Sequence, residues 1–226
     1  MPVFQLEDEL IFPHPVLRDD DGLLAVGGDL SIARLLLAYR WGLFPWYHDD
    51  QPILWWWLVP RLMLRPQQIH ISHSLKSILN KNIFTVTMNT AFREVIQHCG
   101  EIKRMNQEGT WITTDMMEAY MAMHAEGYAH SVEVWRNDEL VGGLYGIAYG
   151  RMFTGESMFA KESNASKVAF VRLAQHLQEK NFEWIDCQQD TPHLRSMGAY
   201  LVEENDFLQI LRFNQKEALQ SGVKQF

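Results

Sequence analysis

The stretch from Ala129 to Gln188 alternates short apolar runs with turn signals, and this pattern constrains the fold more than any other part of the chain. Branched and aromatic residues at 130–135, 140–149 and 151–159 predict three strands, with a turn at Asn137-Asp138. Apolar residues then recur at helical spacing from 168 to 177, and the run at 182–187 fits a last, buried strand. The stretch therefore predicts an α/β unit.

Three polar residues stand out within these apolar runs. Glu156 lies inside the third predicted strand, and Asp186 and Gln188 flank Cys187 at the end of the last one. Because side chains alternate along a strand, positions 186 and 188 are expected to share one face. Strand ends in α/β sheets often border ligand crevices, which favours a binding site. A buried hydrogen-bond network explains the same residues equally well.

Size and charge limit the classes of protein to consider. The 226 residues allow one large domain or two modest ones, and 47% hydrophobic residues suffice for a sizeable core. No apolar run approaches the roughly 20 residues that cross a bilayer, and residues 1–9 do not resemble a signal peptide. The two cysteines show no metal or disulfide spacing, so we expect a cytoplasmic protein. The net charge of −8 argues against a general nucleic-acid-coating protein but permits a local basic patch.

Tryptophan is concentrated between Gly42 and Pro60, at Trp46 and at three consecutive positions, 55 to 57. Consecutive residues of an extended chain face opposite sides, so at least one of the three is expected to be exposed or at an interface. Exposed aromatic rings can stack on nucleic-acid bases, at roughly 1–3 kcal/mol each. A domain interface packed with aromatic rings is the alternative, and composition alone favours it slightly.

Residues 61–66 predict a strand of alternating exposure that marks a domain boundary. We expect a small N-terminal domain over residues 1–62 and a larger domain over residues 63–226. The pair His70 and His73 is a weak metal pattern without further ligands nearby, so no metal site is predicted. The polar segment from Thr191 to Ala199 predicts a turn.

Seven blocks occur in a fixed order along the chain. The blocks are Gly22–Asp29 (GLLAVGGD), Gly42–Trp46 (GLFPW), Pro52–Trp56 (PILWW), Gly109–Thr113 (GTWIT), Gly155–Phe159 (GESMF), Ile185–Gln188 (IDCQ) and His193–Ala199 (HLRSMGA). Together they resemble the leucyl/phenylalanyl-tRNA–protein transferase family. The match spans about residues 12 to 210, and several blocks contain tryptophan, which makes the combination specific.

The resemblance implies both a fold and a reaction. The fold is α+β, with a small N-terminal domain followed by a GCN5-related acyltransferase-like α/β domain. The reaction moves Leu or Phe, and less readily Met, from aminoacyl-tRNA to the α-amine of a protein that begins with Arg or Lys. The product carries an N-end rule degradation signal. The family resemblance also implies a monomer without metal, small cofactor or membrane partner.

The resemblance also implies roles for individual residues. Asp186 matches the position of a general base or amine orienter, Gln188 its polar partner, and Glu156 the acidic residue that faces the peptide. An ordinary Asp, with a pKa near ~3.9, is a poor base for an ammonium group, so orientation is the safer role. Other matches concern the aminoacyl side-chain pocket and the terminal adenosine. The pocket positions are Leu144, Phe153, Met158, Leu173, Leu177 and Ile185, and the adenosine positions are Trp46 and Trp111.

Core packing explains Leu173 and Leu177 as well as a pocket does. The sequence departs from the family at Trp57 and Leu58, where Ser-Pro is frequent, and at Leu144, which is Met in some relatives. The helix after Ser74 offers only two lysines. The cations left for a modest basic face are Lys76, Lys81, Arg61, Arg65, Arg93, Lys103 and Arg104.

Two other functions fit parts of the pattern. An acetyl-CoA-dependent N-acetyltransferase usually needs a glycine-rich pyrophosphate loop before its central helix, and residues 158–166 contain no glycine. A non-catalytic tRNA- or peptide-binding module would not need Asp186, Gln188 and Glu156 within matching motifs. A CoA-binding assay distinguishes the first alternative, and a transfer assay distinguishes the second.

Overall fold

Two β-sheets organise the computed structural model, which describes residues 3–101, 112–221 and 226. A four-stranded sheet has the order β1-β2-β4-β3, and a seven-stranded sheet has the order β11-β5-β10-β9-β8-β7-β6. The strands are β1 (Phe4–Leu6), β2 (Leu23–Gly27), β3 (Phe44–Pro45), β4 (Leu54–Trp56), β5 (Arg61–Leu64), β6 (Thr85–Met88), β7 (Ala129–Arg136), β8 (Glu139–Tyr149), β9 (Met152–Ala160), β10 (Trp184–Gln188) and β11 (Tyr200–Val202).

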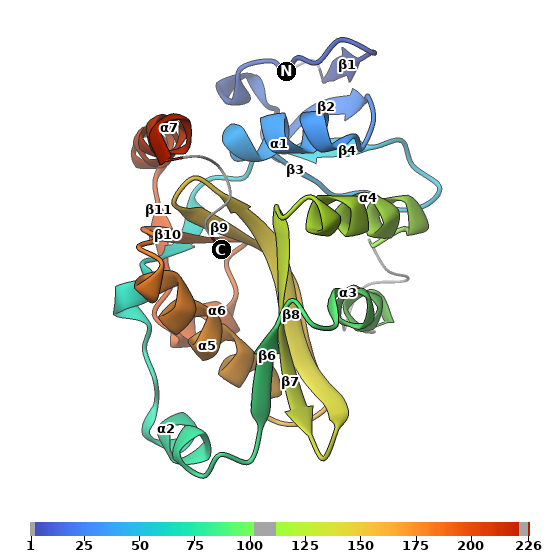
Figure 1. Cartoon of the computed structure of the whole chain (residues 1–226). Coiled ribbons are helices and arrows are strands. Elements are labelled where there is room, and N and C mark those ends of the chain that lie inside the picture. The colour runs from blue at the N-terminus through green and yellow to red at the C-terminus, as the bar shows by residue number, and fades with distance from the viewer. Residues whose placement is uncertain (1–2, 102–111, 222–225) are drawn as a thin grey trace.

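Helices cover the large sheet on both faces (Figure 1). α5 packs on β7, β8 and β9 from one side, while α3 and α4 pack on the other. The helices are α1 (Ile32–Arg40), α2 (His73–Asn80), α3 (Phe92–Glu101), α4 (Thr114–Ala125), α5 (Ala165–Glu179), α6 (Pro192–Ser196) and α7 (Glu204–Ser221), with short 3₁₀ helices η1 (Pro15–Leu17) and η2 (Pro66–Gln68).

The stretch 129–188 folds as its pattern predicts. β7, β8 and β9 form an antiparallel meander, and α5 then returns the chain so that β10 runs parallel to β9. Gly142 permits this return, because a Cβ atom there would lie 2.5 Å from the Cβ of Ala165 at the start of α5. The prediction of an α/β unit is confirmed.

β9 and β10 pair along only a short part of their length. Trp184–Asp186 of β10 pairs with Met152–Thr154 of β9, but β9 continues to Ala160 without β10 beside it. β5 lies on the other side of β10 and runs antiparallel to it. The two parallel strands therefore separate after Thr154 and Asp186, and their exposed edges can border a cavity.

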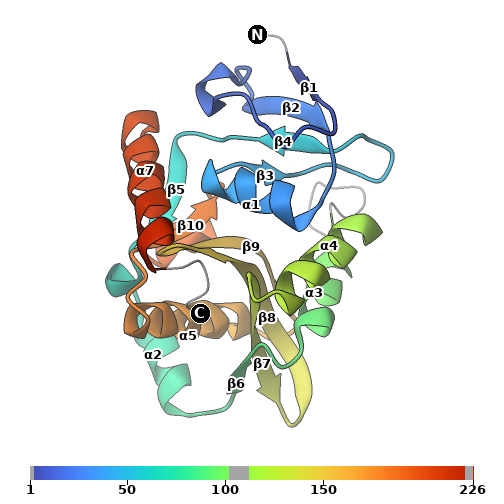
Figure 2. The same cartoon turned by 45° about the horizontal axis from the view of Figure 1, so that its top comes forward.

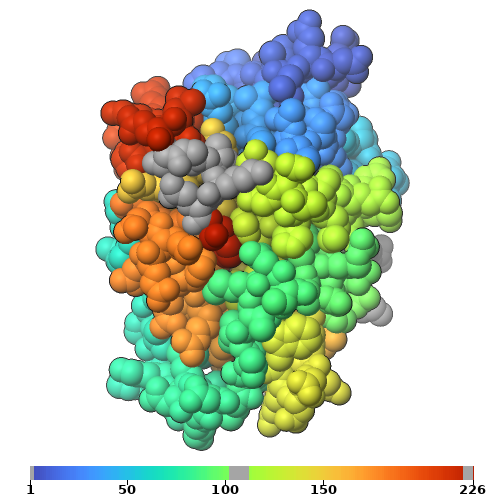
Figure 3. Space-filling view, viewed as in Figure 1, coloured from blue at the N-terminus to red at the C-terminus, as the bar shows by residue number. Residues whose placement is uncertain are grey.

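The small sheet and α1 lie together at one end of the molecule, with α7 beside them (Figures 2 and 3). Trp55 and Trp57 are fully buried there, whereas Trp56 is only partly buried. The indole N–H of Trp55 donates to the carbonyl of Gly27 at 2.9 Å, and the ring of Trp57 packs on Phe207 of α7. Trp55 and Trp57 therefore belong to the hydrophobic core, and the ring of Trp57 connects this end of the molecule with α7.

Two local expectations were wrong. β5 was expected to alternate in exposure, but all four of its residues are buried, because both of its faces are covered: Leu62 and Leu64 pack into one core cluster and Met63 into the other. The segment 191–199 was expected to be a turn, but it contains the short helix α6. The hydroxyl of Thr191 accepts a hydrogen bond from the N–H of Leu194, and Pro192 occupies the first helical turn, which together favour a helix start.

Among the residues that the structure describes, no helix is both long and apolar enough to cross a membrane.

Candidate active site

A cavity of about 570 Å³ opens where β9 and β10 separate. Residues of β8, β9, β10, α5 and α6 line it, together with the segment around β3. The lining residues are Phe44, Pro45, Trp46, Leu144, Tyr145, Phe153, Gly155, Glu156, Ser157, Met158, Phe170, Leu173, Ile185, Asp186, Cys187, Gln188, Gln189, Thr191, His193 and Leu194.

Most of the site residues predicted from the sequence line this cavity. Five of the six expected pocket residues line it, namely Leu144, Phe153, Met158, Leu173 and Ile185, and so does Trp46. Leu177 is fully buried in the core between α5 and the sheet and does not line the cavity. Trp111, Lys103 and Arg104 lie outside the described residues.

Glu156 reaches the polar end of the cavity from β9. One carboxylate oxygen accepts a hydrogen bond from the hydroxyl of Tyr120 at 3.0 Å, and the other accepts from the side-chain amide of Gln188 at 2.9 Å. The hydroxyl of Tyr39 on α1 lies 2.5 Å from that of Tyr120 on α4. Helices from both halves of the chain therefore fix the orientation of this carboxylate.

Burial raises the pKa of Glu156 from its ordinary value of 4.5 to about 7. Hydrogen bonds from the tyrosine hydroxyls oppose this rise in pKa, the negative charge of Asp186 adds to it, and the positive charge of Arg61 opposes it. At neutral pH Glu156 is thus divided between its charged and neutral forms, a state that is common among functional carboxylates.

Asp186 is fully buried on β10 and forms an ion pair with Arg61 of β5. The Nε and Nη2 atoms of Arg61 each donate to one oxygen of Asp186 at 2.7 Å. The backbone N–H of Gln188 donates to Oδ1 of the same carboxylate at 2.9 Å. Three donors therefore hold this carboxylate in one plane, and Arg61 cannot contribute to the exposed basic face that the sequence suggested.

Asp186 and Gln188 do meet at the cavity, as expected, but not through regular alternation. The register with β5 shifts between these two residues, and Gln188 has a left-handed φ of 59°. Such bulges are frequent beside active sites, where they redirect a side chain. The bulge turns the amide of Gln188 toward Glu156, so that the two carboxylates share one polar network.

Cys187 also lines the cavity but is not suited to covalent chemistry. Burial raises the pKa of its thiol well above the usual value, so the nucleophilic thiolate does not form at neutral pH. Within the described ranges, no group of three or more His, Cys, Asp or Glu side chains could hold a metal ion. His70 and His73 therefore belong to no such group.

Sequence reasoning missed Arg61, Tyr39 and Tyr120 as parts of the site. Arg61 and Asp186 are 125 positions apart, and no local pattern links them. Tyr39 and Tyr120 lie on apolar helix faces, where aromatic residues usually indicate a core. The one usable signal was an arginine at the start of the apolar run Leu62–Leu64, since a buried cation needs a buried partner.

Comparisons with known proteins identify the family of the chain. The family profile "Leucyl/phenylalanyl-tRNA protein transferase" matches residues 63–212, and the profile of that transferase's N-terminal domain matches residues 28–56. The prediction of an α+β fold with a small N-terminal domain ahead of the catalytic domain is thereby confirmed. A solved aminoglycoside acetyltransferase from an uncultured soil metagenomic sample is 12% identical, covers 59% of this chain and 88% of its own, and has a TM-score of 0.37, which supports no statement about function.

Curated relatives match almost the whole chain. The leucyl/phenylalanyl-tRNA–protein transferase of Syntrophobacter fumaroxidans is 54% identical over 97% of this chain and 94% of its own length. That of Flavobacterium johnsoniae is 49% identical over 93% of this chain and 99% of its own length. The aminoacyltransferase activity predicted from the sequence blocks agrees with these names. The chain therefore belongs to the leucyl/phenylalanyl-tRNA–protein transferase family.

Proposed function

We propose that the chain transfers Leu or Phe, and less readily Met, from aminoacyl-tRNA to the α-amine of proteins that begin with Arg or Lys. The observation that carries this proposal is one cavity with an apolar part beside two buried carboxylates. The apolar part suits the donor side chain, and the carboxylates suit a cationic acceptor. The product would carry an N-end rule degradation signal, and the enzyme would act as a monomer in the cytoplasm, where aminoacyl-tRNA is available.

Glu156 supports the choice of acceptor. A buried carboxylate forms its strongest hydrogen bonds with a cationic partner such as the side chain of an N-terminal Arg or Lys. Its hydrogen bonds to Tyr120 and Gln188 leave it facing the cavity in a fixed orientation. Binding of a cation would favour the ionised form, so Glu156 would become charged as the acceptor enters.

Asp186 and Gln188 would act on the attacking α-amine. The amine nitrogen attacks the ester carbonyl carbon, the new C–N bond forms, and the C–O bond to the terminal ribose breaks. The proton lost by the amine ends on the ribose oxygen, so the reaction needs no ATP. Because Arg61 already binds both oxygens of Asp186, orientation of the amine suits this carboxylate better than full proton abstraction.

Trp46 would hold the terminal adenosine of the tRNA. Its ring lies 5.8 Å from that of Trp56, tilted by 56°, and Trp46 borders the cavity. An aromatic ring next to a cavity can stack a single-stranded base. We propose the same role for Trp111, and a domain boundary near residue 62, as the sequence suggested.

The test is transfer of label from radiolabelled Leu-tRNA to a peptide that begins with Arg. A matched peptide that begins with Ala serves as the control, and neither ATP nor CoA is added. We expect label in the Arg peptide alone. Label in neither peptide, with folded protein and intact Leu-tRNA, would contradict the proposal and favour a binding module or a CoA-dependent enzyme.

Replacing Leu144 by Ala is expected to shift donor preference from Leu toward Phe. Leu144 borders the cavity, so its truncation removes contacts to a Leu side chain and makes room for a ring. We expect the ratio of kcat/KM for Leu-tRNA over Phe-tRNA to fall by about tenfold. A competition between the two donors with different labels measures this ratio.

Leu177→Ala is the matched control, because Leu177 lies on the same side of the sheet but not in the cavity. It is expected to lower the free energy of unfolding by about 2–5 kcal/mol without changing the donor ratio. An equal change of the ratio in both variants would contradict the assignment of the pocket.

A further inference from the structure

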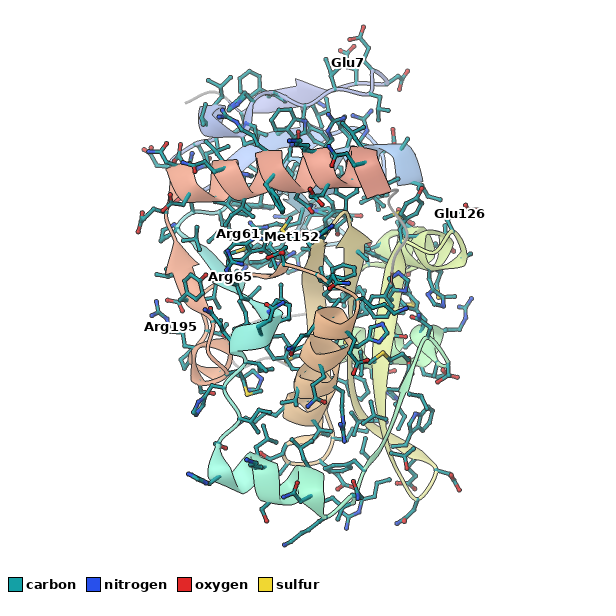
Figure 4. The ribbon with its side chains drawn as sticks, turned by 60° about the vertical axis from the view of Figure 1, so that its left-hand side comes forward. Glu7, Arg61, Arg65, Glu126, Met152 and Arg195 are labelled. Atoms are coloured by element: carbon teal, nitrogen blue, oxygen red, sulfur yellow. The ribbon has the colours of Figure 1, made fainter. Side chains whose placement is uncertain are left out.

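Arg61 has no role in the transfer reaction as described so far, yet it contacts both Asp186 and the carbonyl of Gly42. Its side chain is 1% exposed, and it lies under α7 on β5, with Arg65 just beyond the end of the same strand (Figure 4). Two hydrogen bonds of 2.7 Å join its guanidinium to the two oxygens of Asp186. The same Nη2 atom donates to the carbonyl of Gly42 at 3.1 Å.

Two aromatic rings pack against the guanidinium of Arg61. Its central carbon lies 5.1 Å from the centroid of the Phe44 ring and 5.0 Å from that of Phe207. The Nη1 atom is buried without a hydrogen-bond partner, so contact with ring faces takes the place of a further acceptor. Phe44 itself lines the cavity and lies two residues before Trp46.

We propose that Arg61 is a positioning residue of the transfer reaction. It holds the carboxylate of Asp186 in one orientation and joins it to the segment 42–46, which carries the aromatic residues at the donor side of the cavity. Acceptor amine and donor ester are thereby aligned through one side chain. The inference rests on the transfer function proposed above.

Stability alone does not account for this arrangement. A buried ion pair gains little over apolar residues of the same volume, because both charges lose their hydration. What arginine adds is a planar fork that fixes two oxygens at once, which a lysine ammonium cannot do. Small displacements of a reacting group are costly, since a shift of about 1 Å can reduce a rate by about a hundredfold.

The experiment compares Arg61→Lys with wild type in transfer from Leu-tRNA to the Arg peptide. Lysine keeps the charge and the aliphatic stem but has a single nitrogen, so it loses the coplanar donors that Nε and Nη2 place on the two oxygens of Asp186. We expect kcat to fall by about tenfold, with KM for peptide and for Leu-tRNA changed by less than about threefold. Methylguanidine added to Arg61→Ala should restore part of kcat, and methylammonium should not.

Arg65→Lys is the matched control. Arg65 also pairs with a carboxylate, Glu183 at 3.0 Å, and also lies over an aromatic ring, Trp184 at 4.1 Å. It does not line the cavity, and we expect wild-type kcat from its Lys variant.

The possible outcomes separate this proposal from the proposed function. Wild-type protein that transfers to no peptide would overturn the proposed function itself. Active wild type together with an equally active Arg61→Lys variant would overturn only the positioning role. A Lys variant that does not fold would overturn it in favour of a structural role, and one that changes KM alone would overturn it in favour of a role in substrate binding.

Discussion

Replacing Asp186 by Asn is expected to lower kcat for transfer by about a hundredfold, because the attacking amine loses the group that orients it. Asparagine has the same size and keeps one oxygen for the N–H of Gln188, but it brings an amide group against a guanidinium nitrogen of Arg61. The orienting charge beside the attacking amine is lost at the same time. Label transfer to the Arg peptide under saturating conditions measures the change in kcat.

Loss of stability must be separated from loss of catalysis in this variant. Removing one partner of a buried ion pair leaves the other charge unpaired and costs about 3–5 kcal/mol. The double variant with Asp186→Asn and Arg61→Met removes both charges and should recover most of the unfolding free energy in urea. It should not recover transfer. Near wild-type kcat in the folded double variant would contradict a role of Asp186 in the reaction.

Glu156→Gln is expected to raise KM for the Arg peptide by about a hundredfold and to leave KM for Leu-tRNA unchanged. Glutamine can keep hydrogen bonds to Tyr120 and Gln188, because the tyrosine hydroxyl can also accept a hydrogen bond. Only the negative charge is removed. A peptide that begins with citrulline, the neutral analogue of arginine, is the control. Wild type should prefer Arg over citrulline, and the variant should treat them alike.

The pH dependence of kcat/KM tests the same carboxylate. The pKa of Glu156 is about 7, and the acceptor α-amine, with an ordinary pKa of about 7.7–8.0, must also lose its proton before it attacks, so wild-type kcat/KM for the Arg peptide should rise with pH through both ionisations. The Gln variant should lack the contribution near pH 7 and keep only the later rise that belongs to the amine. An identical rise in the variant would assign the titration to another group and contradict the role of Glu156.

Unfolding of the Gln variant provides its folding control. The pKa of Glu156 is raised in the folded state, so its stabilising contribution is complete below pH 4.5 and is lost as pH rises through 7. At pH 8 the buried charge therefore opposes folding. The variant should match wild type near pH 4.5 and exceed its unfolding free energy by about 3 kcal/mol at pH 8.

The sequence by itself determined much of the local structure. Runs of branched and aromatic residues, turn signals and one period-3.6 pattern between Ala129 and Gln188 correctly predicted three strands, a helix and a last buried strand. Ser31 and Thr113 cap α1 and α4 through their hydroxyl groups, as such residues commonly do before an apolar helix. The ordered motif blocks also predicted the family, because they are local strings that need no folding to recognise.

Two leucines on α5 show what such patterns cannot predict, namely which buried side chain borders the cavity. Leu173 and Leu177 are four residues apart and lie on the same helix face, so periodicity predicts burial for both. Only Leu173 borders the cavity, because the space left by the parted strands reaches one helical turn and not the next. The difference depends on where β9 and β10 separate, which is a property of the packed sheet.

Tertiary structure alone decided which partners the polar groups have. Asp186 meets Arg61 across 125 positions because β5 inserts beside β10 in the sheet, and Glu156 meets the hydroxyl of Tyr120 because α4 packs on the same sheet. Local patterns predict on which face of its own strand or helix a side chain lies. They do not report which distant strand lies next to it, and in a buried site the partner sets both the orientation and the charge of a carboxylate.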